Sequence, residues 1–134
     1  MSEFALKIVT PDGLLYDGMA QQLTVRSTTG DIGILAGHIN CVAPLGMGRA
    51  TVTIDGQKRY AACIGGMLSV VDGKVTLVPT TFEWAEQIDA QRAERSYQKA
   101  QEILGNKESS DTDIKLAEAR LRRALVRKSV AAIK

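Results

Sequence analysis

Short runs of alternating hydrophobic and polar residues in the first 80 positions predict β-strands. The clearest runs are FALKIVT (4–10), GRATVTI (48–54), MLSVV (67–71) and KVTLV (74–78). Tight turns after these runs are indicated by Pro11-Asp12-Gly13, Asp55-Gly56 and Asp72-Gly73. Regularly spaced short strands of this kind are typical of an antiparallel sandwich or barrel.

Two further segments of this half contain internal glycines. Residues 14–27 are expected to form one long strand that bends at Gly18, and residues 31–37 a strand with glycines at its bends. His38, the only histidine, is then expected on a surface turn.

After Pro79 the apolar positions change to helical spacing. From Glu86 to Leu104 they recur at intervals of 4, 3 and 4, namely at Ala93, Tyr97, Ala100 and Leu104. Gly105-Asn106 fits a helix end. A second helix is expected from Thr112 to about Ala131, with Ser110 or Asp111 as its N-cap.

Both expected helices have narrow apolar stripes. The second stripe consists of Ile114, Ala117, Leu121, Ala124 and Leu125. About seven residues connect the helices, which should therefore fold back as an antiparallel hairpin. Alanine permits close approach but buries little area, so at about 25 cal/mol per Å2 this hairpin should be weakly held.

The length of 134 residues fits one ordinary domain, or a small domain with an appendage. With 45% hydrophobic and 24% charged residues, the composition is typical of a soluble globular protein. No run of about 18 apolar residues could span a membrane, and MSEFALKIVT lacks the pattern of a secretory signal. Cys41 and Cys63 form no CxxC pair, and one histidine does not complete a zinc site with them. We expect two reduced, buried thiols and no metal.

Positive charge is concentrated at the end of the chain. From Lys115 onward one acid, Glu118, faces seven basic residues: Lys115, Arg120, Arg122, Arg123, Arg127, Lys128 and Lys134. The absence of interleaved aromatic residues argues against a nucleic-acid site. Arginine forks favour pairing with a defined acidic partner.

The glycine-rich stretch GDIGILAGH (30–38) has several possible roles. Its spacing matches neither the dinucleotide nor the P-loop fingerprint, and no helix is expected after it. A hydrolase site using His38 with Cys41 is an alternative, but no partner that would orient the base is visible. The simplest interpretation is a strand followed by a turn.

The whole chain resembles the epsilon subunit of bacterial F-type (rotary) ATP synthases. The resemblance rests on LKIVTPDGLLYDG (6–18), STTGDIGILAGH (27–38) and Cys63–Met67, in that order, followed by two helices. The chain departs from the family pattern at Ala36 and Asn40, where proline is common, and at Met67, which stands in an aromatic place. The implied fold class is α+β. A ten-stranded antiparallel β-sandwich (1–85) would bind the rotor, and an antiparallel two-helix hairpin (86–134) would regulate ATP hydrolysis.

The resemblance implies a non-catalytic subunit at the cytoplasmic face of the bacterial cell membrane. The sandwich would join the shaft (gamma subunit) to the c-ring, with Thr29, Gly30 and Asp31 facing the polar loops of the ring and His38 at a shaft or ring contact. The helices would inhibit ATP hydrolysis when extended. Their contacts with acidic residues of the alpha and beta subunits would come from Arg120, Arg122, Arg123 and Arg127.

No cofactor is required, but some relatives bind regulatory ATP in the folded hairpin. Their motif Ile/Leu-Asp-x-x-Arg-Ala is matched by Ile88-Asp89-Ala90-Gln91-Arg92-Ala93. The implied ATP contacts are Glu83, Ile88, Asp89, Arg92, Ala93, Lys99 and Arg122, where Lys99 stands in place of a frequent arginine. The alternative is structural: Glu83, Glu86 and Asp89 are acids that complement the dipole of a helix start. A stand-alone ATP sensor without a rotor is the remaining rival.

Overall fold

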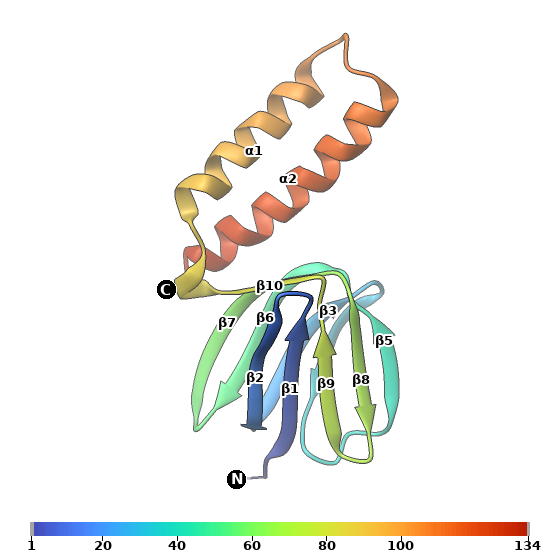
Figure 1. The fold of residues 1–134 in the computed structure, drawn as a ribbon, viewed down its shortest axis with the longest axis vertical. Coiled ribbons are helices and arrows are strands. Elements are labelled where there is room, and N and C mark those ends of the chain that lie inside the picture. The colour runs from blue at the N-terminus through green and yellow to red at the C-terminus, as the bar shows by residue number, and fades with distance from the viewer. Residues whose placement is uncertain (1, 134) are drawn as a thin grey trace. The chain divides into compact units, whose positions relative to one another are not determined.

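The computed structural model describes residues 2–133, which form two compact units divided between Trp84 and Ala85 (Figure 1). Within the described residues the first unit holds ten strands, and the second holds two α-helices and a short 3-10 helix. The expected α+β fold, a ten-stranded sandwich followed by two helices, is confirmed.

The strands form two five-stranded sheets, in the orders β2-β1-β9-β8-β5 and β10-β7-β6-β3-β4. Their bounds are β1 (Phe4–Thr10), β2 (Gly13–Ala20), β3 (Gln22–Ser27), β4 (Gly30–Ile34), β5 (Cys41–Pro44), β6 (Met47–Ile54), β7 (Gln57–Ile64), β8 (Met67–Val71), β9 (Lys74–Val78) and β10 (Thr81–Trp84). One pairing departs from the expected antiparallel pattern, because β1 runs parallel to β9 with Leu6 beside Val75. No hairpin connects these two strands, so no turn constrains their direction.

The expected hairpins at the two Asp-Gly pairs are confirmed. Asp55 and Gly56 have φ values of 51° and 77°, and Asp72 and Gly73 have values of 49° and 81°. Two successive positive φ values define the type I′ turn, whose twist matches that of antiparallel strands. Residues 14–27, by contrast, do not form one strand bent at Gly18. They form β2 and β3, which belong to different sheets and are separated at Gln21.

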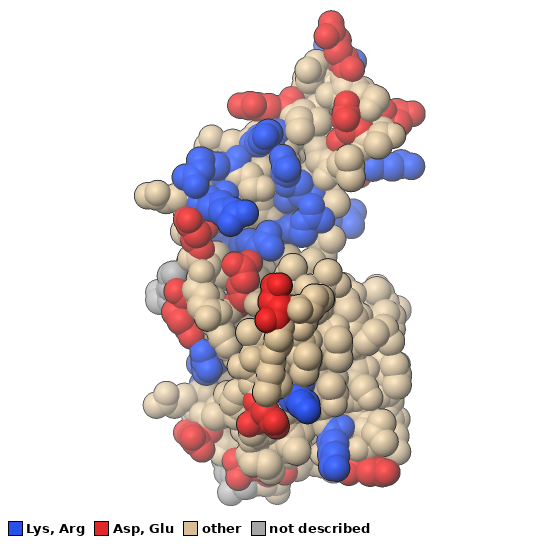
Figure 2. All heavy atoms as spheres, viewed as in Figure 1, with Lys and Arg blue, Asp and Glu red and all other residues tan. Residues whose placement is uncertain are grey.

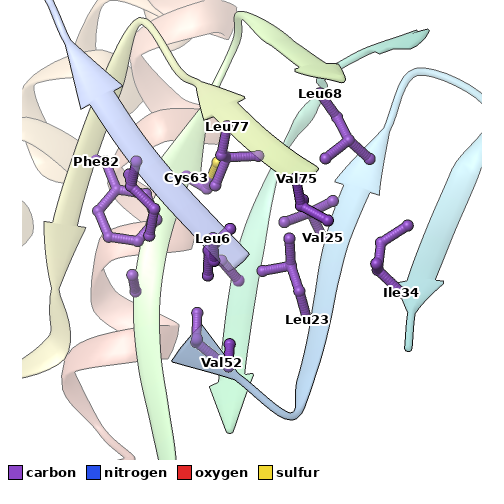
Figure 3. Packing of buried hydrophobic residues seen from close by; sticks show 14 of the residues in the cluster. Leu6, Leu23, Val25, Ile34, Val52, Cys63, Leu68, Val75, Leu77 and Phe82 are labelled. Atoms are coloured by element: carbon purple, nitrogen blue, oxygen red, sulfur yellow. The ribbon is translucent and has the colours of Figure 1, made fainter. Parts of the chain in front are cut away.

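The core of the sandwich comes from the inward positions of these alternating strands. Leu6 and Ile8 of β1, Leu23 and Val25 of β3 and Leu77 of β9 are almost completely buried. Figure 3 shows side chains of this kind from strands of both sheets directed into one shared interior. The first unit therefore has a continuous aliphatic core.

The two cysteines are free thiols in different surroundings. Cys63 lies within the core (Figure 3), and its burial raises the thiol pKa to about 12. Cys41, on β5, is only half-buried, so the expectation that both thiols are buried is wrong for Cys41. The β5 strand has only four residues, so the alternation of hydrophobic and polar residues was too short to predict which face Cys41 occupies.

The second unit consists of a 3-10 helix (Ala85–Gln87), α1 (Ala90–Gly105) and α2 (Asp111–Ala131). The expected start of the first helix at Glu86 is wrong, because α1 begins after its N-cap, Asp89. Of the three acids expected at that helix start, Glu83 lies in β10 and Glu86 in the 3-10 helix, and only Asp89 caps α1. Ser110 caps α2 through a reciprocal pair of hydrogen bonds with Asp113, as the sequence allowed.

Alanines line the seam between the two helices. Ala93 and Ala100 are buried on α1, and Ala117 and Ala124 on α2. Leu125, which was expected to join this stripe, is instead exposed. A buried alanine methyl contributes about 0.8 kcal/mol, against about 1.5–3 kcal/mol for a buried leucine. The seam therefore brings the helices close together while contributing little hydrophobic stabilisation.

The sandwich depends on glycine at position 66. This residue has a φ of +95°, and a β-carbon there would lie 2.0 Å from the Val78 carbonyl oxygen. We predict that Gly66→Ala lowers the free energy of unfolding by about 3 kcal/mol or more, through backbone strain and overpacking. Urea titration followed by fluorescence of Trp84, the only tryptophan, measures the loss.

Gly33→Ala is the matched control. Gly33 lies in β4, and a β-carbon there would meet nothing within 4 Å. Its stability should change by no more than about 0.5 kcal/mol. Equal effects of the two substitutions would contradict the special role of Gly66.

Candidate interaction surfaces

The Thr28-Thr29 turn joins β3 to β4 and is fixed by the buried hydroxyl of Ser27. This hydroxyl donates to the Gly30 carbonyl at 2.6 Å and accepts from the Thr29 N–H at 3.2 Å. Gly30 has a φ of +138°, which favours glycine. Beyond the turn, Asp31 lies opposite Arg26 across the strands, with 3.7 Å between their charged atoms. The turn thus presents exposed Thr29 and Asp31 on a rigid support.

His38 lies in the loop between β4 and β5. Its N–H donates to the Leu35 carbonyl at 3.2 Å, and its Nδ1 is 2.8 Å from the Ile39 carbonyl oxygen. This ring therefore bonds to its own neighbour's backbone. Among residues 2–133 no hydrogen bond joins His38 to Cys41. The hydrolase alternative therefore lacks the base–nucleophile pair that it requires.

Asn40 fastens this loop to the β8–β9 turn. The Asp72 N–H donates to the Asn40 Oδ1 at 2.9 Å, and the Asn40 Nδ2 lies 3.5 Å from the Asp72 carboxylate. Asparagine thus supplies hydrogen bonds at a position where the family pattern commonly has proline.

The two predicted contact regions of the sandwich lie at opposite ends of β4. Gly30 begins this strand and Ile34 ends it, a span of roughly 13 Å at 3.3 Å per residue. The Thr28 N–H bonds to Pro44, at the end of β5, whereas Asn40 precedes its start. Thr29–Asp31 and His38 are therefore two separate surfaces, and no helix follows the glycines to make a phosphate cradle.

An apolar surface that sequence reasoning missed covers the outer side of the β5–β8–β9 sheet. Pro44 of β5 and Val78 of β9 both lie directly opposite Met67 of β8, so their side chains share one face. Nearby on β5, Val42 is 64% exposed, and Ile39 in the preceding loop is 77% exposed. We call Ile39, Val42, Pro44, Met67 and Val78 the apolar outer face. Adjacent exposed apolar residues of this kind are typical of an interaction surface. The signal was present in MLSVV, where two of the three outward positions, Met67 and Val71, are hydrophobic.

In the segment Ile88–Ala93, which was expected to bind ATP, Asp89 has a structural role. Asp89 Oδ1 accepts from the Arg92 N–H at 3.0 Å and so caps α1. Ile88 and Ala93 are buried, which removes their side chains from any polar ligand contact. Glu83 lies in the sandwich unit, on β10, and its role in a nucleotide site stays a prediction.

Two basic side chains of α1 remain exposed on one side of the hairpin. Arg92 precedes the seam residue Ala93 by one position, or about 100° of rotation, and Lys99 lies two turns further along the same side. Glu94 lies on the other side, where its carboxylate meets the Lys128 ammonium of α2. Arg127 precedes Lys128 and is rotated by about 100° away from Glu94, toward the side of Arg92.

Arg120 and Arg123 lie seven and four positions before Arg127 and so share its stripe on α2. We call Arg92, Lys99, Arg120, Arg123 and Arg127 the basic flank. Figure 2 shows Lys and Arg side chains gathered over one face of this helical unit. Anions are therefore attracted to one side of the folded hairpin.

Arg122 is not part of the basic flank. It precedes the seam residue Ala124 by two positions, or about 200°, and is exposed on the outer side of α2. The structure therefore does not bring Arg122 together with Arg92. The spacing of Ala117 and Ala124 in the sequence already defines the seam side of α2. This spacing could have predicted that Arg123, and not Arg122, lies on the same side of the hairpin as Arg92. Lys134, counted among the basic residues, lies outside the described residues.

No helix within residues 2–133 is both long and apolar enough to cross a membrane. The same residues contain no group of three His, Cys, Asp or Glu side chains placed to hold a metal ion.

Family models match both units of the chain. Residues 3–85 match the ATP synthase delta/epsilon chain beta-sandwich domain, and residues 86–132 match the delta/epsilon chain long alpha-helix domain. The chain belongs to the ATP synthase delta/epsilon family. The resemblance to epsilon subunits is confirmed by a Bacillus velezensis protein called ATP synthase epsilon chain, 45% identical over 131 residues and 98% of each chain. The Bacillus subtilis protein of the same name is 47% identical over 86% of each chain.

Solved structures support the fold. A chain of the Euglena gracilis mitochondrial ATP synthase OSCP/F1/c-ring structure superposes with a TM-score of 0.84 at 23% identity, covering 100% of this chain and 83% of that one. A chain of the Tetrahymena thermophila mitochondrial ATP synthase central stalk and c-ring gives 0.69 at 12% identity, covering 97% of both. At these identities the likeness concerns the fold alone.

The capping role of Asp89 can be separated from any role of its charge. Asp89→Ala should cost about 1 kcal/mol of helix stability and speed amide exchange at Arg92, because the N–H of Arg92 loses its acceptor. Asp89→Asn should retain the cap and near-normal exchange, since asparagine is an equally good N-cap. NMR exchange at the Arg92 amide measures both. Equal acceleration in the two variants would show that the carboxylate charge, not the cap, holds this turn.

Proposed function

We propose that this chain is a non-catalytic central-stalk subunit of an F-type ATP synthase, in which it joins the rotor shaft to the c-ring. The observation that carries the proposal is the family match over both units, at residues 3–85 and 86–132. The Bacillus velezensis protein named ATP synthase epsilon chain covers 98% of the chain, so the same assembly role fits both units. The subunit would then lie peripherally at the cytoplasmic face of the bacterial cell membrane.

The two surfaces of the sandwich fit two partners. The polar Thr29–Asp31 turn suits the polar loops of the c-ring, because its exposed groups can exchange hydrogen bonds with them. The apolar outer face, with the nearby His38 loop, suits the gamma subunit, since burying it would remove Ile39 and Val42 from water. The turn and the His38 loop lie at opposite ends of β4, so a partner can be bound at each, while the apolar outer face extends along β5 from Ile39 to Pro44, beside the turn.

The helical unit is proposed to restrain ATP hydrolysis by opening and contacting acidic residues of the alpha and beta subunits. The alanine seam supports this role, because a switch needs two states that differ by only a few kcal/mol. Arg120, Arg123 and Arg127 provide one cationic stripe for such a contact. Arg122 lies on another side of α2 and would need a different partner.

Deleting residues 88–134 tests the inhibitory role. The shortened chain keeps all ten strands and should still assemble with the motor. ATP hydrolysis by the assembled enzyme should rise about twofold or more if at least half of the wild-type enzyme is held inhibited. Unchanged hydrolysis at saturating subunit, with assembly intact, would contradict inhibition. Failure to recover the shaft subunit in a pull-down would instead contradict the rotor role.

We further propose that regulatory ATP binds the basic flank of the folded hairpin and so favours the non-inhibitory state. Arg92 offers a planar donor group for a phosphate, and Lys99 a point charge two turns away. Arg123, on the facing side of α2, completes this arrangement better than Arg122 does. The cap carboxylate of Asp89 has a second oxygen that can accept from the nucleotide.

Calorimetry with ATP separates these arginines. Arg92→Ala and Arg123→Ala should each weaken ATP binding roughly tenfold or more, the usual effect of losing a charge-assisted hydrogen bond. Arg122→Ala is the matched control and should bind like wild type, because its side chain lies on the outer side of α2. No heat with the wild-type chain would remove the nucleotide proposal. An equal loss in Arg122→Ala would contradict the assignment to the basic flank.

A further inference from the structure

The side of the hairpin opposite the basic flank carries a polar cluster that joins the two helices. The Lys128 Nζ of α2 lies 2.6 Å from the Glu94 Oε2 of α1 and 4.1 Å from the centre of the Tyr97 ring. One ammonium group thus makes an ion pair and a cation–π contact at the same time. Both contacts cross the alanine seam near the end of the hairpin where α1 starts and α2 stops.

Glutamines hold both α1 partners in place. Gln98 Nε2 donates to the Glu94 Oε1 at 3.2 Å, and Gln101 Nε2 donates to the Tyr97 hydroxyl at 2.9 Å. Each pair is spaced four positions apart, the spacing at which side chains on a helix meet. Because Glu94 and Tyr97 are already oriented, less side-chain freedom is lost when Lys128 contacts them.

From this cluster we infer that Lys128 is a latch that holds the hairpin folded and sets how often it opens. Lys128 and Glu94 are 34% and 43% exposed, so the ion pair alone would be weak. The adjoining alanine seam contributes little, however, which makes the latch a substantial part of what joins the helices. The lowered pKa of Glu94, caused first by its hydrogen bond from Lys128, agrees with a formed contact.

The basic residues of α2 fall into two groups with different proposed roles. Lys128 lies on the side of Glu94 and is occupied within the folded hairpin, whereas the stripe of Arg120, Arg123 and Arg127 lies on the other side. A substitution at Lys128 removes its contacts with Glu94 and Tyr97 and leaves the arginines of that stripe in the sequence. The balance between the folded and open states can therefore be altered without altering the basic flank.

Hydrogen exchange on the isolated full-length chain tests the latch. Lys128→Met should speed amide exchange in both α1 and α2 about three- to tenfold, the range expected for an exposed ion pair with a cation–π contact. Exchange in β6 and β7 should stay unchanged. Lys115→Met, which removes an exposed lysine from the same helix, should exchange like wild type, and Lys128→Arg should restore protection. NMR titration should show the pKa of Glu94 rising in Lys128→Met.

Helix exchange in Lys128→Met equal to that in wild type and Lys115→Met would overturn the latch. The consequence for the assembled motor rests on the proposed inhibitory role: Lys128→Met should lower ATP hydrolysis, because more hairpins are open. Faster helix exchange with unchanged hydrolysis would support the latch and contradict the inhibitory role, so the two failures can be told apart.

Discussion

The close packing of two helices through alanine is the constraint on which the behaviour of this chain depends. Ala93 and Ala100 of α1 meet Ala117 and Ala124 of α2, and methyl groups this small let the backbones approach while burying little apolar surface. The seam defines which residues face outward on either side of it. It also leaves the folded hairpin dependent on polar contacts such as that of Lys128 with Glu94.

The sandwich follows the opposite principle. Its interior is filled by large aliphatic side chains from both sheets, and its corners are set by turns that require particular residues, such as Gly66. A packed core of this kind does not deform by small degrees. The rigid unit can therefore present fixed surfaces at both ends of β4, while the helical unit is the part that we propose to change state.

Much of the fold could be predicted from the sequence, because its signals are local. The Asp-Gly turns fix the strands on either side of them, and Ser110 and Gly105-Asn106 mark helix ends. The break at Gln21 could not be predicted, since the exchange of a strand between sheets depends on packing across the core. For the site, the motif around Asp89 was visible. The separation of Arg122 from Arg123 required the helix to be oriented by its seam, and the Lys128 contacts join residues 34 positions apart.

A distance measurement distinguishes a hairpin that occupies two states from a hairpin that stays folded. Spin labels at Gln91 and Ser129 lie at the open end of the hairpin, on exposed positions outside the seam, in a chain whose Cys41 and Cys63 are replaced by alanine. In the assembled motor with ATP the account predicts one short distance, and without ATP a second, longer distance that Lys128→Met increases in population. A single short distance under both nucleotide conditions, in wild type and variant alike, would contradict it.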